Sequence, residues 1–194
     1  MIIRMLKDNS GIGITILTLL IIPVLLLMWI SSVNITKSVS DYDVGLQAIV
    51  AEAVKNASFM VDRGSMALGK PTINSDLALE AFHNIINTNI KHGNVGGYQL
   101  VVFNYGYGDN GDIHIYKYND GSLQYEKHED IEGEKTFYVS NDGISLTSGD
   151  NKITLDEPGC IGIAWLDSEE FLGRGETEGA RWAVSSIYLA KDFN

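Results

Sequence analysis

The sequence predicts an α+β protein: an N-terminal transmembrane helix that continues into an amphipathic helix, a second short helix, and then a mainly antiparallel β-sheet head. Three observations lead to this prediction. Residues 11–33 form an apolar run, the next part of the chain has helical periodicity, and from residue 93 β-branched and aromatic runs alternate with Gly, Asn and Asp turns. Helices followed by a series of short strands are typical of α+β folds.

The apolar run is long enough to cross a membrane. No charged side chain lies between Asp8 and Lys37, and the 23 residues 11–33 are almost wholly apolar. As a helix they reach about 34 Å, against a hydrocarbon core of roughly 30 Å. A cleaved secretory signal is the alternative, but its apolar core is shorter, about 7 to 15 residues. Pro23 removes one backbone hydrogen bond and is expected to kink the span.

Charge sets the orientation of this segment. Arg4 and Lys7 precede it, so the positive-inside rule puts residues 1–10 in the cytoplasm and the rest of the chain beyond the span outside. Residues 38–194 hold 11 bases and 24 acids, a formal charge of −13. We therefore predict a single-pass cell-membrane protein with an acidic extracytoplasmic domain. This acidity opposes binding to phosphates, so no nucleic acid partner is predicted.

The region 34–92 is predicted to be helical. Its first helix either starts afresh at Ser40 or Asp41 or runs on from the span, and we expect Gly64 and the Gly-Lys-Pro at 69–71 to end it. A second helix is predicted from Asn74 or Ser75 to His92, packed across the sheet. The apolar stripe of the first helix recurs at steps of three and four residues and includes Leu46, Ile49, Val50, Ala53, Val54, Ala57, Met60 and Val61.

The region 93–194 is predicted to be the β-rich head. Gly106, Gly108 and Gly111 match G-x-G-x-x-G, but they lie between two strands, so we predict a hairpin and not a dinucleotide site. A loop at 167–179 is expected to be mobile, and the acid-rich residues 126–134 are predicted to form a solvated turn. The strands are expected at 98–105, 112–118, 122–127, 136–140, 144–147, 152–155, 160–166 and 181–191.

No pattern of catalytic residues is present in the sequence. The histidines His83, His92, His114 and His128 have no zinc-ligand spacing, and Cys160 is the single cysteine. We predict that the protein is not an enzyme, that it holds no cofactor or metal, and that its histidines lie on strand surfaces or in solvent.

One turn leaves a metal alternative open. Asp109, Asn110 and Asp112 bring three oxygen ligands together, as calcium requires. Ordinary turn chemistry explains the same residues, because Asp and Asn side chains bond their own backbone.

The N-terminal half resembles a known family. A short basic leader, Ser10-Gly11 opening the span, Pro23 within it and an amphipathic helix after it are similar to type IV pilin-like proteins. The helix that starts at Asn74 and the Asn87-x-Asn89 pattern resemble more closely the TadE/TadG-like pseudopilins of the tight-adherence (Flp) pilus. The resemblance covers about residues 4–92.

The resemblance implies a structural role in a pilus or surface-assembly system, as a protein displayed for assembly or adhesion. Leader cleavage is implied at Gly11 or Gly13. The fifth mature position then holds Ile16 or Thr18, where pilins carry Glu, which favours a minor subunit. The implied partners are membrane lipid, other pilin-like subunits or pilus assembly proteins, and a surface ligand. Helix-packing residues for assembly are predicted to be Gly11, Gly13, Pro23, Leu46, Ile49, Val50, Ala53 and Ala57.

Two alternatives remain at this point. The apolar stripe that includes Leu46 and Ala57 packs either against other subunits or against its own domain. The protein as a whole is either a pilin-like subunit or a single-pass anchored module outside any filament. Such a module would bind a sugar, peptide or ion through a sheet face or the loop 167–179.

Overall fold

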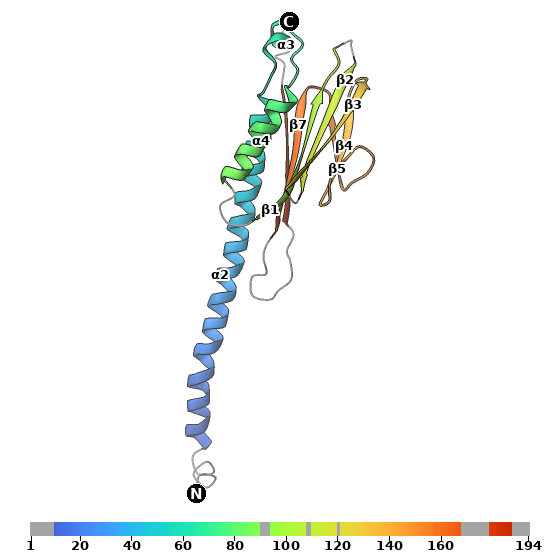
Figure 1. Cartoon of the computed structure of the whole chain (residues 1–194). Helices are drawn as coiled ribbons and strands as arrows, with labels where there is room; N and C mark the ends of the chain where they lie inside the picture. The colour runs from blue at the N-terminus through green and yellow to red at the C-terminus, as the bar shows by residue number, and fades with distance from the viewer. Residues whose placement is uncertain (1–9, 90–93, 108–109, 120, 168–178, 188–194) are drawn as a thin grey trace, which may run out of the picture. The chain divides into compact units, whose positions relative to one another are not determined.

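The computed structural model describes residues 10–89, 94–107, 110–119, 121–167 and 179–187. Side chains in the N-terminal part are described for residues 20–30 and again from 45 onward. The chain divides into two compact units, Met1–Val44 and Gly45–Asn194. The second unit contains both sheets together with the helices that cover one of them (Figure 1).

The first element, α2, is one helix from Ser10 to Ser58, 49 residues long. It contains Pro23 and shows no fresh start at Ser40 or Asp41, so the continuous alternative is the correct one. Residues 11–33 lie within α2, although most of their side chains lie outside the described part. Within the residues that the structure describes, no helix combines the length and the apolar character needed to cross a membrane.

The predicted end of this helix at Gly64 is wrong, because α2 ends at Ser58. The Ser58 hydroxyl hydrogen-bonds the carbonyl of Lys55 at 2.8 Å and the hydroxyl of Ser185 at 2.9 Å. Such a side chain competes with the helical backbone. Met60 and Val61 therefore lie beyond the helix, and Val61 forms a β-bridge with Ile73.

Two shorter helices follow. Helix α3, Arg63–Ala67, is capped by Asp62, whose carboxylate accepts a hydrogen bond from the Ser65 amide at 2.9 Å. Helix α4, Ser75–Asn89, is capped by Asn74, whose side chain accepts from the Leu77 amide at 3.1 Å. This confirms the second helix and one of its two predicted caps, while residues 90–93 lie outside the described part.

The strands form two antiparallel sheets, whereas one sheet was predicted. The larger has the order β3-β2-β1-β7-β8 and the smaller the order β5-β4-β6. β1 and β2 pair antiparallel as the predicted hairpin, with Gly111 as the first residue of β2. The strand bounds are β1 Asn94–Asn104, β2 Gly111–Asn119, β3 Ser122–Ile131, β4 Lys135–Ser140, β5 Gly143–Ser145, β6 Asn151–Leu155, β7 Gly159–Asp167 and β8 Gly179–Ser186.

The two faces of the larger sheet are buried by different partners. On one face Leu100 and Val102 pack with side chains of α2 and α4. On the other, Val101 and Phe103 pack with the smaller sheet. The alternation along β1 thus makes three layers, helices, large sheet and small sheet. The described core of the helix side includes Leu46, Val50, Ala53, Val54, Ala57, Ile73, Ala78, Phe82, Ile86, Tyr98, Leu100, Val102, Tyr116, Cys160 and Ala164.

Two buried side-chain amides connect the layers. The Asn104 side chain accepts a hydrogen bond from the Ile73 amide at 2.7 Å and donates to the Ile73 carbonyl at 3.1 Å. Gln99 does the same with Ile144, at 2.9 Å for both bonds. Each amide satisfies one backbone donor and one backbone acceptor as a neighbouring strand would. Asn104 ties the segment before α4 to the large sheet, and Gln99 ties the small sheet to it.

Two sequence expectations about the head change in detail. Glu126, Glu129 and Asp130 belong to β3, which runs to Ile131, so only the last part of the predicted acidic turn follows the strand. β8 ends at Ser186, and residues 188–191 of the predicted last strand lie outside the described part.

Candidate functional site

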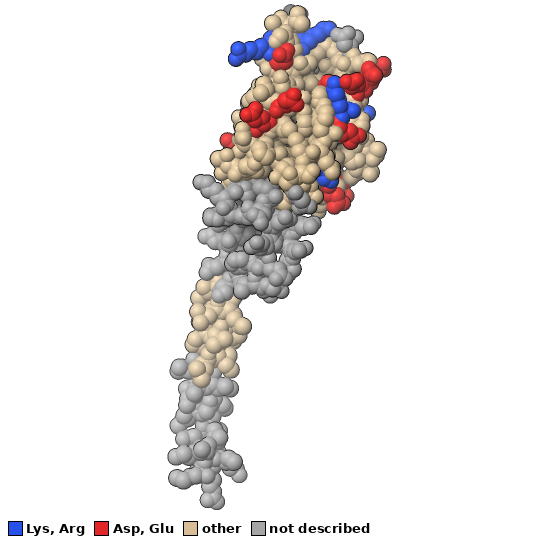
Figure 2. All heavy atoms as spheres, in the orientation of Figure 1, with Lys and Arg blue, Asp and Glu red and all other residues tan. Residues whose placement is uncertain are grey.

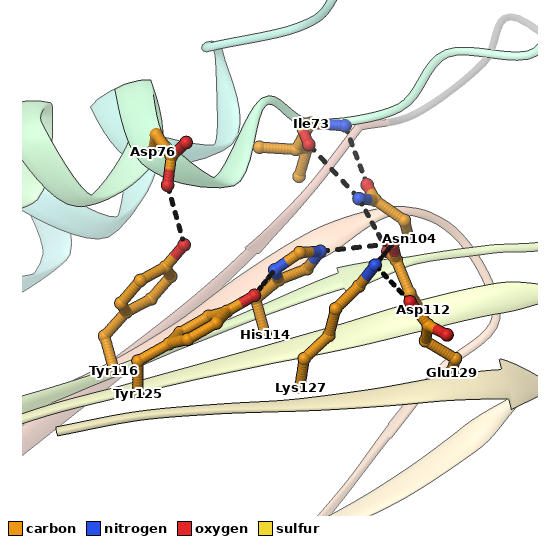
Figure 3. A network of polar contacts seen from close by, with 9 residues as sticks. All are labelled: Ile73, Asp76, Asn104, Asp112, His114, Tyr116, Tyr125, Lys127 and Glu129. Atoms are coloured by element: carbon orange, nitrogen blue, oxygen red, sulfur yellow. Dashed lines mark hydrogen bonds and ion pairs between the residues drawn. The ribbon is translucent and has the colours of Figure 1, made fainter.

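A line of polar side chains lies on the helix-side face of β2 and β3 (Figure 3). His114 is at its centre. Its Nε2 lies 3.1 Å from Asp112 Oδ2, and its Nδ1 lies 2.9 Å from the Tyr125 hydroxyl. Register explains the arrangement, because His114 and Asp112 are two residues apart on β2 and Tyr125 lies on the neighbouring strand. The line Asp112–His114–Tyr125 thus joins two strands.

Charged groups extend this line at one end. Lys127 Nζ lies 2.6 Å from Glu129 Oε1 and 3.8 Å from Asp112 Oδ2. Asp112 also accepts a hydrogen bond from the side chain of Asn104 at 3.0 Å. The hydrogen bond from His114 holds the pKa of Asp112 below its ordinary value; partial burial opposes this shift, and the Asn104 bond and the charges of His114 and Lys127 add to it.

The lowered pKa of Asp112 predicts a specific dependence of stability on acid. A depressed carboxyl pKa stabilises the fold above the unfolded pKa, about 3.9, and the contribution is lost as pH falls through the folded pKa. Between these two pKa values the unfolded chain binds more protons. Urea unfolding of the full chain in detergent is therefore expected to weaken more steeply below pH 4 for the wild type than for Asp112→Asn.

A second substitution controls for the cause of this pH dependence. In a His114→Val background the largest cause of the shift is absent, so the effect of adding Asp112→Asn on the pH profile is expected to shrink. Parallel pH profiles of the wild type and Asp112→Asn would contradict the assignment.

Aromatic rings surround the polar line. Tyr116 and Tyr125 have ring centroids 5.0 Å apart, and Tyr98 stacks on Tyr118, also at 5.0 Å. The Tyr116 hydroxyl donates to Asp76 of α4 at 3.2 Å. His83 Nδ1, also on α4, lies 2.6 Å from the Tyr98 hydroxyl. Burial, as the main cause, raises the pKa of both Tyr98 and Tyr116 to about 12, so these phenols stay protonated as donors.

Part of this aromatic surface is open. Leu123 is 48% exposed and Tyr125 is 54% exposed, although their neighbours Tyr116 and His114 are buried or half-buried. We call the helix-side surface formed by His114, Tyr116, Tyr118, Leu123 and Tyr125 the β2–β3 ledge. The ledge offers the exposed ring of Tyr125, whose hydroxyl already bonds His114, next to carboxylates. Such a surface is suited to binding by ring contact and charge.

The predicted helix-packing residues fall into two groups. Leu46, Val50, Ala53 and Ala57 are buried in the core between α2, α4 and the large sheet, and Ile49 is half-buried against it. Their stripe therefore packs on its own domain, and these side chains are not available to another subunit. Gly11, Gly13 and Pro23 all lie inside α2, and the surroundings of Gly11 and Gly13 lie outside the described part.

The predicted calcium ligands have other partners. Asn110 donates to Asp130 at 2.6 Å, while Asp112 bonds Asn104 and His114. Asp109 lies outside the described residues. Across the described ranges no group of three or more His, Cys, Asp or Glu side chains could hold a metal ion.

The ledge is not visible in the sequence, because each histidine taken singly carries no signal of a site. Only a strand register, with Asp112 and His114 two residues apart on one strand and Tyr125 opposite, would have signalled the line. His114 is also less exposed than predicted, since 11% of its side-chain surface remains accessible.

Comparison of the chain with family models, with curated proteins and with solved structures finds no match.

Proposed function

We propose that this protein is a membrane-anchored, minor pilin-like subunit that displays an acidic α+β head outside the membrane. The observation that carries the proposal is the surface of α2 between Leu20 and Ile30. Ten large apolar side chains there are each 45–68% exposed, on all sides of the helix. Figure 2 shows no charged atoms on this stretch. A helix that is apolar all round requires lipid or other apolar helices around it.

The continuity of α2 supports a structural role. Its apolar first part and its buried last part belong to one helix, from Ser10 to Ser58. The last part supplies Leu46, Val50 and Ala57 to the core of the head. An anchor that continues as a core helix couples the head to whatever surrounds the apolar part, as the resemblance to pilin-like proteins implies.

The apolar surface of α2 between Leu20 and Ile30 is also the proposed assembly surface. Because the apolar stripe at 46–57 is buried in the core of the head, contacts with other subunits are assigned to the apolar first part of α2. Small residues at Gly11 and Gly13 permit close helix approach, and exposed Leu and Ile side chains provide apolar contact.

The test uses the full chain in its own membranes. Alkaline carbonate is expected to leave the wild type in the membrane fraction, while Leu25→Lys/Leu26→Lys is expected to release it. Each Lys at mid-span costs about 2.5 to 3.5 kcal/mol of insertion energy. Thr147→Lys/Ser148→Lys, with the same added charge in the exposed head, is the matched control and is expected to stay in the membrane.

Intact mass and a photo-crosslinker at Trp29 complete the test. A mature N-terminus at Ile12 or Ile14, with crosslinks to other apolar helices, would support a pilin-like subunit. Release of the wild type by carbonate, or a mature N-terminus beyond Ser32, would overturn the proposal. Crosslinks to lipid alone would instead favour the anchored binding module.

A further inference from the structure

Strand β3 forms an edge of the large sheet. It pairs with β2, and among the described strands it has no second neighbour. It is ten residues long, and eight of its residues are exposed. An edge strand of this length presents unpaired N–H and C=O groups along its outer side, which can pair with an added extended segment.

The charge of β3 selects the kind of segment that can be added. Glu126, Glu129 and Asp130 oppose one lysine, Lys127, within the strand. Two copies of this edge would place like charges beside each other, which disfavours self-pairing. A basic segment would instead meet opposite charge over the second half of the edge, at Glu129 on the ledge face and at Glu126 on the other face. The formal charge of −11 for the whole chain favours the same partner at long range.

The β2–β3 ledge borders this edge on the helix side. Tyr125 lies on β3 itself and exposes its ring beside the network of Asp112, Lys127 and Glu129, in which two carboxylates face one ammonium group. Across the ledge, Asp76 of α4 bonds Tyr116, and Glu80 follows Asp76 by one helical turn. A cationic side chain placed next to Tyr125 would contact an aromatic face among carboxylates, the setting of a cation–π contact.

From these observations we propose that β3 and the β2–β3 ledge form a docking site for an extended, arginine- or lysine-bearing segment of a partner protein. The segment adds to the large sheet as a strand beside β3. Because side chains alternate along a strand, every second residue of the segment faces the ledge, and a basic residue there lies against Tyr125. This site does not depend on the membrane anchor.

The test measures binding of a labelled ten-residue peptide of alternating Arg and Val to the full chain in detergent. Binding is expected, together with slower hydrogen exchange of β3 backbone amides. A Glu–Val peptide and an Arg–Val peptide with alternate backbone nitrogens methylated are expected not to bind. The first removes charge complementarity, and the second removes the backbone donors that an edge strand requires.

Matched variants locate the site. Glu129→Lys, a single charge reversal on the ledge face of β3, is expected to weaken peptide binding by about tenfold, and Tyr125→Leu by roughly two- to fivefold. Asp150→Lys, an equally exposed charge reversal in the turn before β6, is expected to bind as the wild type does.

Three results would overturn the proposal. Equal loss of binding in Asp150→Lys would show attraction by overall charge alone. Unchanged exchange of β3 amides, or full binding of the methylated peptide, would exclude strand addition. Displacement of the peptide by equimolar spermidine would show a site for small cations. Circular dichroism of each variant confirms that the head is folded.

Discussion

Replacing Phe82 with alanine is expected to lower the free energy of unfolding by about 3 to 5 kcal/mol. Phe82 is fully buried on α4, and its ring meets Tyr98 edge-on at 5.4 Å. The ring also fills the space above Gly162 of β7, where an added Cβ would lie 2.6 Å from Phe82 and 2.5 Å from Val54. Removing it leaves a cavity where α2, α4 and the sheet meet.

Chemical unfolding of the full chain in detergent, followed by tryptophan fluorescence, measures this loss. Leu77→Ala is the control, because Leu77 lies on the same helix but is 49% exposed. Its expected change is within about 0.5 kcal/mol, apart from helix propensity. A loss for Phe82→Ala as small as the loss expected for Leu77→Ala would show that α4 contributes little to the core.

The second large effect is expected for Asn104→Ala, which should lower the free energy of unfolding by about 2 to 4 kcal/mol. Two buried backbone groups then lose their partner, and each unsatisfied group costs about 1 to 3 kcal/mol. The substitution removes the only side chain that bonds both the amide and the carbonyl of Ile73 among the described residues. Asp112 loses a hydrogen bond as well. The same unfolding experiment measures the loss.

Two companion variants sharpen this prediction. Asn104→Asp keeps the acceptor for Ile73 but loses the donor and places a second carboxylate beside Asp112, so it is also expected to destabilise the fold. Asn84→Ala, on the exposed side of α4, is expected to change stability by less than about 0.5 kcal/mol. Wild-type stability of Asn104→Asp would show that the donated bonds contribute nothing.

The spacing of apolar residues correctly predicted most of the helices and strands. The steps of three and four residues predicted α2 and α4, and alternation with Gly, Asn and Asp turns predicted the strands. The end of α2 was not predictable from Gly64, because the helix ends earlier, at Ser58, whose hydroxyl bonds Ser185 on β8. That contact joins residues 127 positions apart, and no local pattern contains it.

The candidate site was less predictable than the fold. Asp112, His114 and Tyr125 are ordinary as single residues, and their alignment depends on the pairing of His114 with Lys127 and of Tyr116 with Tyr125. A slip of one residue in that register would turn Tyr125 to the other face of the sheet. The ledge is thus a product of strand register.

By itself the sequence determined the local properties of this protein: an apolar segment, an acidic remainder, two helices and a series of strands. These properties follow from the composition of each segment and the spacing of its apolar residues, both of which are set by residues close together in the sequence. Only the tertiary structure decided that the strands divide into two sheets and that the 46–57 stripe is buried in its own head. It alone also brought Asp112, His114 and Tyr125 into line. These outcomes depend on contacts between distant residues, whose free energies are settled by the whole fold.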